Sequence, residues 1–311
     1  MNGRGEMLAL LGVLVGLVAA FSLATERFFS LATFRTIANQ VPEGVIVAVG
    51  LTFVLMIAGI ALSVGSVLGL ASAVLGLAML RLGGGLLLGG LLAVLTGLAC
   101  GALNGLLTVR FAVPSFIVTL GMLEAARGAT YLITRSQTQY VGARVETLAE
   151  GAVLGLSVPF LAAVGLVALG QFVLSRTVFG RYAVAIGANE EAVRLSGIDP
   201  RPVKVAVFML AGALAGLAGI VNTARLGAAD PNAGIGFELQ AIAAVVVGGT
   251  SLMGGRGSVV GSFLGVLVIA VLASGLAQAG AQEPTKRLVT GVVIAGAAIA
   301  DALRRRRWSE K

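Results

Sequence analysis

Long apolar runs are the feature that most constrains how this chain of 311 residues can fold. Of its residues, 58% are hydrophobic and only 12% are charged, about half the charged fraction of a typical soluble domain. A helix needs about 20 apolar residues to cross the hydrocarbon core of a bilayer, and runs of this kind recur along the chain. We therefore expect an all-α polytopic membrane protein.

The apolar runs predict about ten membrane segments, some of them short, broken or re-entrant. They cover residues 8–24, 43–62, 64–80, 86–109, 114–133, 153–174, 203–222, 239–253, 258–277 and 286–303. The second and third segments almost touch, which indicates that one of them is broken inside the membrane. The eighth is short and ends in Gly254-Gly255-Arg256-Gly257, which fits a re-entrant segment or a tight turn. Together the segments predict a single transmembrane domain over residues 1–311.

Glycine is frequent, with 45 residues, and several glycines recur at every fourth position. Small residues at this spacing lie on one helix face and let two helices approach closely in lipid, where hydrophobicity itself does not drive helix association. We expect such packing at Gly97, Gly101 and Gly105, at Gly212 and Gly216, and at Gly257, Gly261 and Gly265.

The chain contains no histidine and one cysteine, Cys100, inside an apolar run. Histidine-dependent zinc sites, Ser-His or Cys-His nucleophiles and an intrachain disulfide are therefore excluded. We predict no cofactor, no metal site and no catalytic residue. The nearest approach to a phosphate-binding loop begins at Gly249, but Gly255 stands where the loop needs its lysine. ATP hydrolysis is therefore expected on a separate chain.

The distribution of Arg and Lys predicts the orientation. If ten segments place both termini on one side, that side carries more basic residues than the other, which indicates that both termini are cytoplasmic. The net charge of +8 then reflects cytoplasmic loops rather than binding to nucleic acid. The four arginines at 304–307 are expected beside anionic membrane lipid.

One charged segment, residues 175–204, interrupts the apolar sequence and suggests a docking surface for a soluble partner. Asn189 suits the N-cap of a short helix, Glu190 and Glu191 would occupy its first turn, and Gly197 would end it. Arg194 follows Glu190 by four residues, the spacing of a helical ion pair. A solvated loop helix without a partner remains the alternative.

Several of these stretches resemble ribose-type permeases of ABC importers. The resemblance rests on GANEEAVRLSGI at 187–198, on GFELQAIAAVVVGGTSLMGGRGSVVG at 236–261, and on the shorter matches VPSFIVTLG at 113–121, Arg127-Gly128 and LSVGS at 62–66. The matches keep the family's order along nearly the whole chain. One departure is Ala61, because the family usually has Asp at this position in its Gly-Ile-Asp-Leu-Ser-Val-Gly-Ser sequence.

The resemblance implies a membrane-spanning subunit of an ATP-driven importer for a sugar or similar small polar solute, in the bacterial cytoplasmic (inner) membrane. It implies three kinds of protein partner: ABC ATPase subunits, an extracytoplasmic solute-binding protein, and a second copy of this chain or a related permease. Residues 175–204 would couple the permease to the ATPase. The residues expected to do so are Gly187, Asn189, Glu190, Glu191, Arg194 and Gly197.

Polar residues within the apolar segments are candidates for lining the translocation path, because intramembrane polar groups usually face the bundle interior or water. The candidates are Ser63, Ser66, Asn104, Phe116, Thr119, Glu124 and Thr250, with Asn222 as a further polar position. Most of the uncharged ones also fit a role in hydrogen bonding between helices. Glu124 and Arg127, three residues apart, fit either a structural ion pair or a lining of the path.

A secondary transporter is the alternative function, and it would need its own intramembrane carboxylates for ion coupling. Only Glu124 lies deep in an expected span, and residues 175–204 would then have no purpose. An intramembrane enzyme is disfavoured because the chain lacks histidine, paired aspartates in its spans and a Gly-x-Ser-x-Gly sequence. The sequence leaves open the solute and the choice between homodimer and heterodimer.

Overall fold

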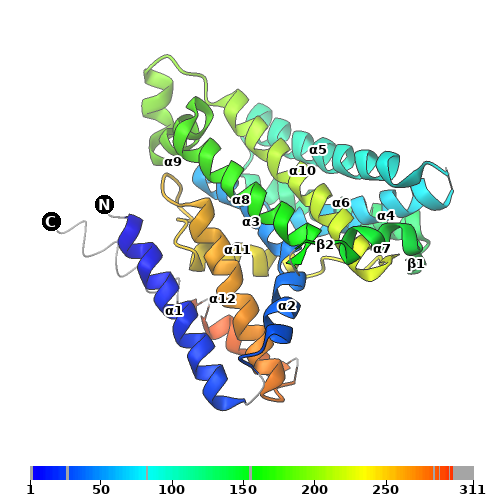
Figure 1. The fold of residues 1–311 in the computed structure, drawn as a ribbon. Helices are drawn as coiled ribbons and strands as arrows, with labels where there is room; N and C mark the ends of the chain where they lie inside the picture. Colours follow the sequence, from blue (N-terminus) through cyan, green and yellow to red (C-terminus); the bar gives the residue numbers. More distant parts are fainter. Residues whose placement is uncertain are drawn as a thin grey trace.

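The protein is described by a computed structural model covering residues 3–25, 28–81, 83–153, 156–282, 284–286, 288–293 and 295–296. The described chain is predominantly helical (Figure 1). Its helices are α1 Gly3–Ala24, α2 Leu31–Gln40, α3 Pro42–Met56, α4 Val64–Leu80, α5 Gly85–Phe111, α6 Ser115–Thr134, α7 Ala143–Glu150, α8 Val158–Arg176, α9 Val178–Leu195, α10 Arg201–Leu226, α11 Phe237–Val247 and α12 Val259–Gln278.

Six of the described helices are long and apolar enough to cross a membrane, namely α1, α5, α6, α8, α10 and α12. A seventh span results if α2 and α3, which meet at a bend of 48°, count as one broken span. Helices α4 and α11 are apolar but shorter. The chain is therefore a multi-pass helical membrane protein, as the apolar runs predict.

Two expected segments differ from the helices observed. The segment expected at 43–62 ends as a helix at Met56, and residues 59–63 run in non-helical conformation to the start of α4. The segment expected at 239–253 contains only α11, whose 11 residues at about 1.5 Å each fall well short of a bilayer core of about 30 Å. The expectation of broken and short segments is thus confirmed at both places.

The last expected segment, residues 286–303, falls largely outside the described residues. Its described parts, residues 286, 288–293 and 295–296, are helical. The arginines at 304–307 also lie outside the described residues, so their expected contact with lipid stays a prediction.

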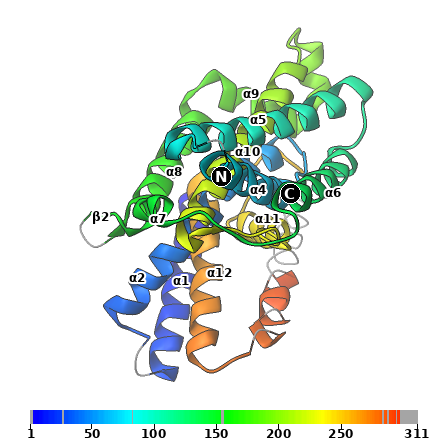
Figure 2. The same cartoon turned by 90° about the vertical axis from the view of Figure 1, so that its right-hand side faces the viewer.

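Helix α3 is the centre of the core (Figure 1). Every residue of α3 except Gly44 is buried, and the helix packs against α8, α10, α11 and α12. Helix α1 lies beside α12 at the edge of the molecule, as Figures 1 and 2 show. A helix so completely covered by other helices needs no polar face, which explains why residues 44–56 are apolar almost throughout.

The glycine stripes of α5 and α10 bring these two helices into backbone contact. A Cβ atom at Gly97 would overlap the carbonyl oxygen of Gly212, and one at Gly101 would overlap that of Phe208. A Cβ at Gly212 would overlap the carbonyl oxygen of Gly97 in turn. The predicted close packing is confirmed here. It is also confirmed for Gly261 and Gly265 of α12, which meet the backbone of α11 and of the turn that follows it, whereas Gly257 precedes α12 in a loop.

Four strands of two residues each form two antiparallel pairs in the loops at the end of the molecule away from α9. Strand β1, Gln139–Tyr140, pairs antiparallel with β4, Ala228–Ala229, and β2, Ala152–Val153, pairs with β3, Leu156–Ser157. The first pair fastens the segment after α6 to the end of α10. Helix α7 and these strands were not expected from the apolar pattern, because they lie in the less apolar connections between the spans.

Candidate functional site

The charged segment folds as predicted around a short helix. Helix α9 is interrupted at Asn189, whose φ of −164° and ψ of 96° are non-helical. The Asn189 Oδ1 accepts a hydrogen bond from the backbone N–H of Ala192 at 2.9 Å. Asn189 therefore serves as the N-cap of a separate short helix that ends at Leu195, as the sequence predicts.

Gly197 ends this short helix, also as predicted. Its φ of +81° lies in the left-handed region that glycine adopts without steric cost. The N–H of Gly197 bonds the carbonyl oxygen of Arg194 at 3.0 Å, and the N–H of Ile198 bonds that of Val193 at 3.3 Å. These two bonds form the Schellman motif that closes many helices.

The ion pairs of the short helix differ from the expectation. Arg194 does not pair with Glu190; its Nη2 contacts Glu191 Oε1 at 2.8 Å. Glu190 instead pairs with Lys204 of α10 at 2.9 Å, because the bend at Asn189 brings this turn against the start of α10. Glu190 thus anchors the short helix, while Glu191 and Arg194 are both more than half exposed and available to a partner.

Gly187 lies at a junction of three backbone segments just before the short helix. A Cβ atom at Gly187 would overlap the carbonyl oxygen of Met56, the last residue of α3, and would approach Gly255 N at 2.5 Å. The N–H of Gly255 donates to the same Met56 carbonyl at 2.9 Å. A Cβ at Gly254 would in turn meet the carbonyl oxygen of Gly187 at 2.8 Å. Helix α9, the end of α3 and the loop after α11 are therefore in direct backbone contact at this junction.

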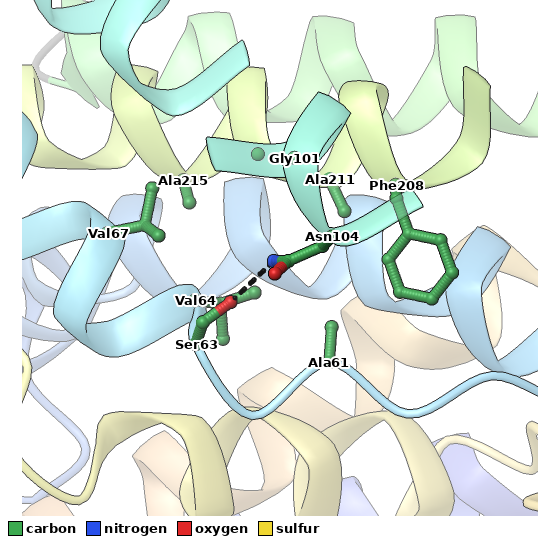
Figure 3. A pocket seen from close by; sticks show the side chains of 10 residues that line it. Ala61, Ser63, Val64, Val67, Gly101, Asn104, Phe208, Ala211 and Ala215 are labelled. Carbon is green, nitrogen blue, oxygen red and sulfur yellow. Dashed lines mark hydrogen bonds between the residues drawn. The ribbon is translucent and has the colours of Figure 1, made fainter. Parts of the chain in front are cut away.

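Two of the path candidates, Ser63 and Asn104, line a cavity that is too small for a solute (Figure 3). Asn104 Nδ2 donates to Ser63 Oγ at 3.0 Å, and both side chains are buried between α4, α5 and α10. The cavity beside them holds about 10 Å³, about the room of one water molecule. Ala61 lies on its wall, and none of the described residues that line it is charged. Ser66, nearby on α4, is also buried.

Thr119 holds the non-helical segment that joins α3 to α4. Its Oγ1 accepts from the N–H of Leu62 at 3.1 Å and lies 3.2 Å from the carbonyl oxygen of Ile60. Ser115 Oγ accepts from the N–H of Ile60 at 2.9 Å. The unwound backbone therefore finds in α6 the partners that it loses by leaving the helix. The neighbouring Phe116 is 46% exposed.

The other candidates also make contacts that the sequence did not reveal. Arg127 does not form a salt bridge with Glu124, which is exposed; its Nη1 donates to the carbonyl oxygens of Pro231 at 3.1 Å and Ala233 at 2.7 Å. Thr250 is buried in the turn between α11 and α12, with its Oγ1 3.2 Å from Ser262 Oγ. Arg127 thus fixes the loop before α11, and Thr250 fixes the turn after it.

A second cavity, which the sequence analysis missed, is both larger and polar. It measures about 230 Å³ and lies between α3, α4, the end of α10 and the loop before α11. Glu43 and Arg225 on its wall form a salt bridge of 2.7 Å, and Asn222 Nδ2 donates to the other oxygen of Glu43 at 3.0 Å. Glu43 stands at the start of an apolar run and 182 residues from Arg225, so spacing alone gave no signal.

The described residues contain no group of three or more His, Cys, Asp and Glu side chains placed to hold a metal ion.

Comparison with known proteins identifies the family. Residues 33–298 match the family described as "Branched-chain amino acid transport system / permease component". The chain belongs to this permease family. The permease is 38% identical over 293 residues to the ribose import permease of Haemophilus influenzae, covering 93% of this chain and 90% of that protein. No solved structure matches the permease.

Other relatives show a similar extent of likeness. The permease is 38% identical over 302 residues to the ribose import permease of Escherichia coli K12, covering 95% of this chain and 93% of the relative. It is 34% identical over 294 residues to the fructose import permease of Rhizobium meliloti, covering 92% and 82%. The resemblance drawn from residues 187–198 and 236–261 is thereby confirmed, and the chain is a transport subunit rather than an enzyme.

Proposed function

We propose that the permease is the membrane subunit of an ATP-driven importer that carries a pentose, a hexose or a similarly small polar solute. The observation that carries this proposal is its similarity, over more than nine-tenths of the chain, to import permeases for ribose and D-allose, and to one for fructose. Its partners would be two ABC ATPase subunits, an extracytoplasmic solute-binding protein and a second permease, either identical or related.

In this proposal residues 175–204 form the cytoplasmic coupling segment. Glu191 and Arg194 would contact the ATPase, because they are the exposed charges of the short helix. Asn189 and Gly197 would keep that helix in shape through its two caps, and Glu190 would hold it against α10. Gly187 would pass its displacement to α3 and to the loop after α11.

The orientation follows from the same assignment. Residues 175–204 and both termini would be cytoplasmic, in the bacterial inner membrane, and the end of α10 at Leu226 would face outward. The topology of about ten segments would comprise the six long helices, the bent pair α2–α3, the short helices α4 and α11, and residues 286–303.

The solute would pass close to the unwound segment 57–63. The buried side chains of Ser63, Ser66, Asn104, Thr119 and Thr250 would support the elements that border this path. Phe116 and Glu124, both exposed in the single chain, would face the path or the second permease.

A secondary transporter is the competing function. It would couple uptake to an ion bound at intramembrane carboxylates. Glu43 is the carboxylate that is buried among the described residues, and it is already bound to Arg225 and Asn222. The observed pairing therefore favours energy from a separate ATPase.

The test is reconstitution of the permease in liposomes with the ATPase and binding protein encoded beside it. Radiolabelled ribose, fructose and allose would be supplied outside with the binding protein, and ATP would be enclosed. We expect uptake of at least one sugar that requires hydrolysable ATP and is insensitive to ionophores. Uptake by the permease alone, driven by a proton or sodium gradient, would overturn the proposal.

A further inference from the structure

We propose that the polar cavity between α3, the end of α10 and residues 231–240 is the first binding site for the solute on the permease. The site would take a neutral, hydroxyl-rich ligand of the size of a pentose or hexose. This inference rests on the proposed function and adds to it the place where the solute is held and the chemical class that the site selects.

The size and position of the cavity fit this role. Its volume of about 230 Å³ is far above the 10 Å³ of the cavity beside Ala61 and Asn104. A single water molecule needs only about 10–15 Å³ in this measure, so the cavity has room for a small solute. It lies at the end of α10 opposite the coupling segment, where a solute released by an extracytoplasmic protein would arrive.

The two charged residues that line the cavity, Glu43 and Arg225, are paired with each other, which favours a neutral ligand. Glu43, only 6% exposed, is bound by Arg225 at 2.7 Å and by Asn222 at 3.0 Å. Glu238 of α11 does not line the cavity, and its Oε2 is buried without a hydrogen-bond partner. The one carboxylate and the one guanidinium group on the cavity wall therefore balance each other.

This pairing argues against an amino acid as the ligand. A zwitterion would need a free cation for its carboxylate and a free anion for its ammonium group, and separating Arg225 from Glu43 to provide them is costly for a buried carboxylate. A sugar makes no such demand, since its hydroxyl groups are neutral and each can donate and accept hydrogen bonds.

Asn222 supplies a hydrogen-bond acceptor that the protein itself leaves unused. The residue is 6% exposed and lines the cavity, and its Nδ2 is committed to Glu43. Its Oδ1 is buried and accepts no hydrogen bond from the protein. A buried polar atom without a partner is costly, so a hydroxyl donated by a ligand at this point is favoured strongly.

The rest of the lining suits the other faces of a sugar. The amides of Asn232 and Gln240 are exposed at the rim and can donate to or accept from further hydroxyl groups. Phe237, Ile235 and Leu68 offer apolar surface to the C–H face of the ring. Arg127 keeps this wall in place through the carbonyl oxygens of Pro231 and Ala233.

Two variants test the site in the complete importer. Asn222→Leu removes the unused acceptor at nearly constant volume, and with it the bond from Nδ2 to Glu43. Ile235→Trp keeps that bond and fills the cavity from a residue that is 61% exposed, so that folding is little affected. Leu132→Trp is the matched control, since Leu132 is 82% exposed, lies in the last turn of α6 and does not line the cavity. Uptake of labelled ribose, fructose and allose and ATP hydrolysis are measured together, with saturating loaded binding protein.

We expect Asn222→Leu to lower the number of solute molecules imported per ATP by about tenfold, the effect of a lost hydrogen bond to a buried group. We expect Ile235→Trp to lower it at least as much, because the larger side chain occupies the space of the solute. ATP hydrolysis stimulated by the binding protein should stay within twofold of wild type, as should every property of Leu132→Trp. An Ile235→Trp variant that folds and imports as many molecules per ATP as wild type would overturn the inference, whatever Asn222→Leu does. Absence of ATP-dependent sugar uptake by the wild-type importer would instead overturn the proposed function itself.

Discussion

The two ends of the permease are built from different kinds of contact. At the end that we propose couples to the ATPase, called the coupling end below, Gly187, Met56 and Gly255 meet through backbone atoms with no side chain between them. At the opposite end, Glu43, Asn222 and Arg225 meet through side chains around a cavity of about 230 Å³. Backbone contact transmits displacement because it has no rotamers with which to absorb it. Side-chain contact around open space can rearrange when a solute binds.

This contrast predicts that the coupling end tolerates change least. Gly187→Ala adds a Cβ that overlaps the carbonyl oxygen of Met56, so the backbone of α9 or α3 has to shift. We expect near-complete loss of uptake and a fall of about 1–3 kcal/mol in the free energy of unfolding. Gly165→Ala is the matched control, because nothing lies within 4 Å of a Cβ at that helical position. The measurements are the thermal unfolding and the uptake of the two variants. If both variants unfold and transport alike, the close contact of Gly187 with Met56 and Gly255 is not needed for transport.

The small cavity beside Ala61 lies between the two ends of the permease. A substitution there shows what it means that this chain has Ala61 where the family usually has Asp. Ala61→Asp would place a carboxylate against a wall without a charged residue, where the cavity has room for about one water molecule. We expect a loss of about 1–3 kcal/mol in the free energy of unfolding, because the described residues that line the cavity offer no positive charge to compensate a buried carboxylate. Ala61→Ser is the control and should lie closer to wild type. A more stable Ala61→Asp variant would show that the site accepts the group that relatives carry.

The exposed charges of the short helix should matter for coupling and little for stability. Glu191→Arg breaks the pair with Arg194 and sets two like charges three residues apart on the surface that we propose binds the ATPase. We expect about tenfold lower uptake, with unfolding changed by less than about 1 kcal/mol because the pair is exposed. Adding Arg194→Glu restores the pair in reverse. If the double variant recovers full uptake, the pair acts by shaping the helix; if it does not, Glu191 itself contacts the ATPase.

The smallest effect is expected at the rim of the polar cavity. Gln240→Ala removes one exposed amide, and an exposed hydrogen bond to a neutral ligand is worth only about 0.5–1 kcal/mol, or about a twofold to fivefold change in import per ATP. Gln137→Ala, another exposed glutamine in the loop after α6, is the control. An equal response of both variants would place Gln240 outside the solute's contacts.

The sequence predicted well wherever structure depends on neighbours along the chain. The α4 helix, Val64–Leu80, has the predicted bounds, and the caps at Asn189 and Gly197 form through bonds between residues three to five positions apart. Prediction from the sequence failed where the two residues that bond are far apart along the chain. Glu190 bonds Lys204 across a bend, because the relative placement of α9 and α10 decides which lysine or arginine is within reach.

The end of α3 shows the same limit. Residues 57–62 are apolar, so hydropathy continues the segment to Leu62, and nothing local marks the break. The helix stops at Met56 because Ser115 and Thr119 of α6 satisfy the N–H groups of Ile60 and Leu62. The polar cavity was missed for the same reason, since Glu43 and Arg225 meet only once α3 and α10 are packed.

The way in which Ile60 and Leu62 are held has a consequence for observing the transport cycle. Their amide hydrogens are bonded to two hydroxyl groups on another helix, not to carbonyls of their own helix. Any separation of α6 from this segment exposes them, while the amides within α3 and α4 stay protected. We therefore expect a peptide covering residues 57–63 to take up deuterium faster during ATP-driven transport than in the resting importer. Its exchange rate would report how often α6 separates from this segment.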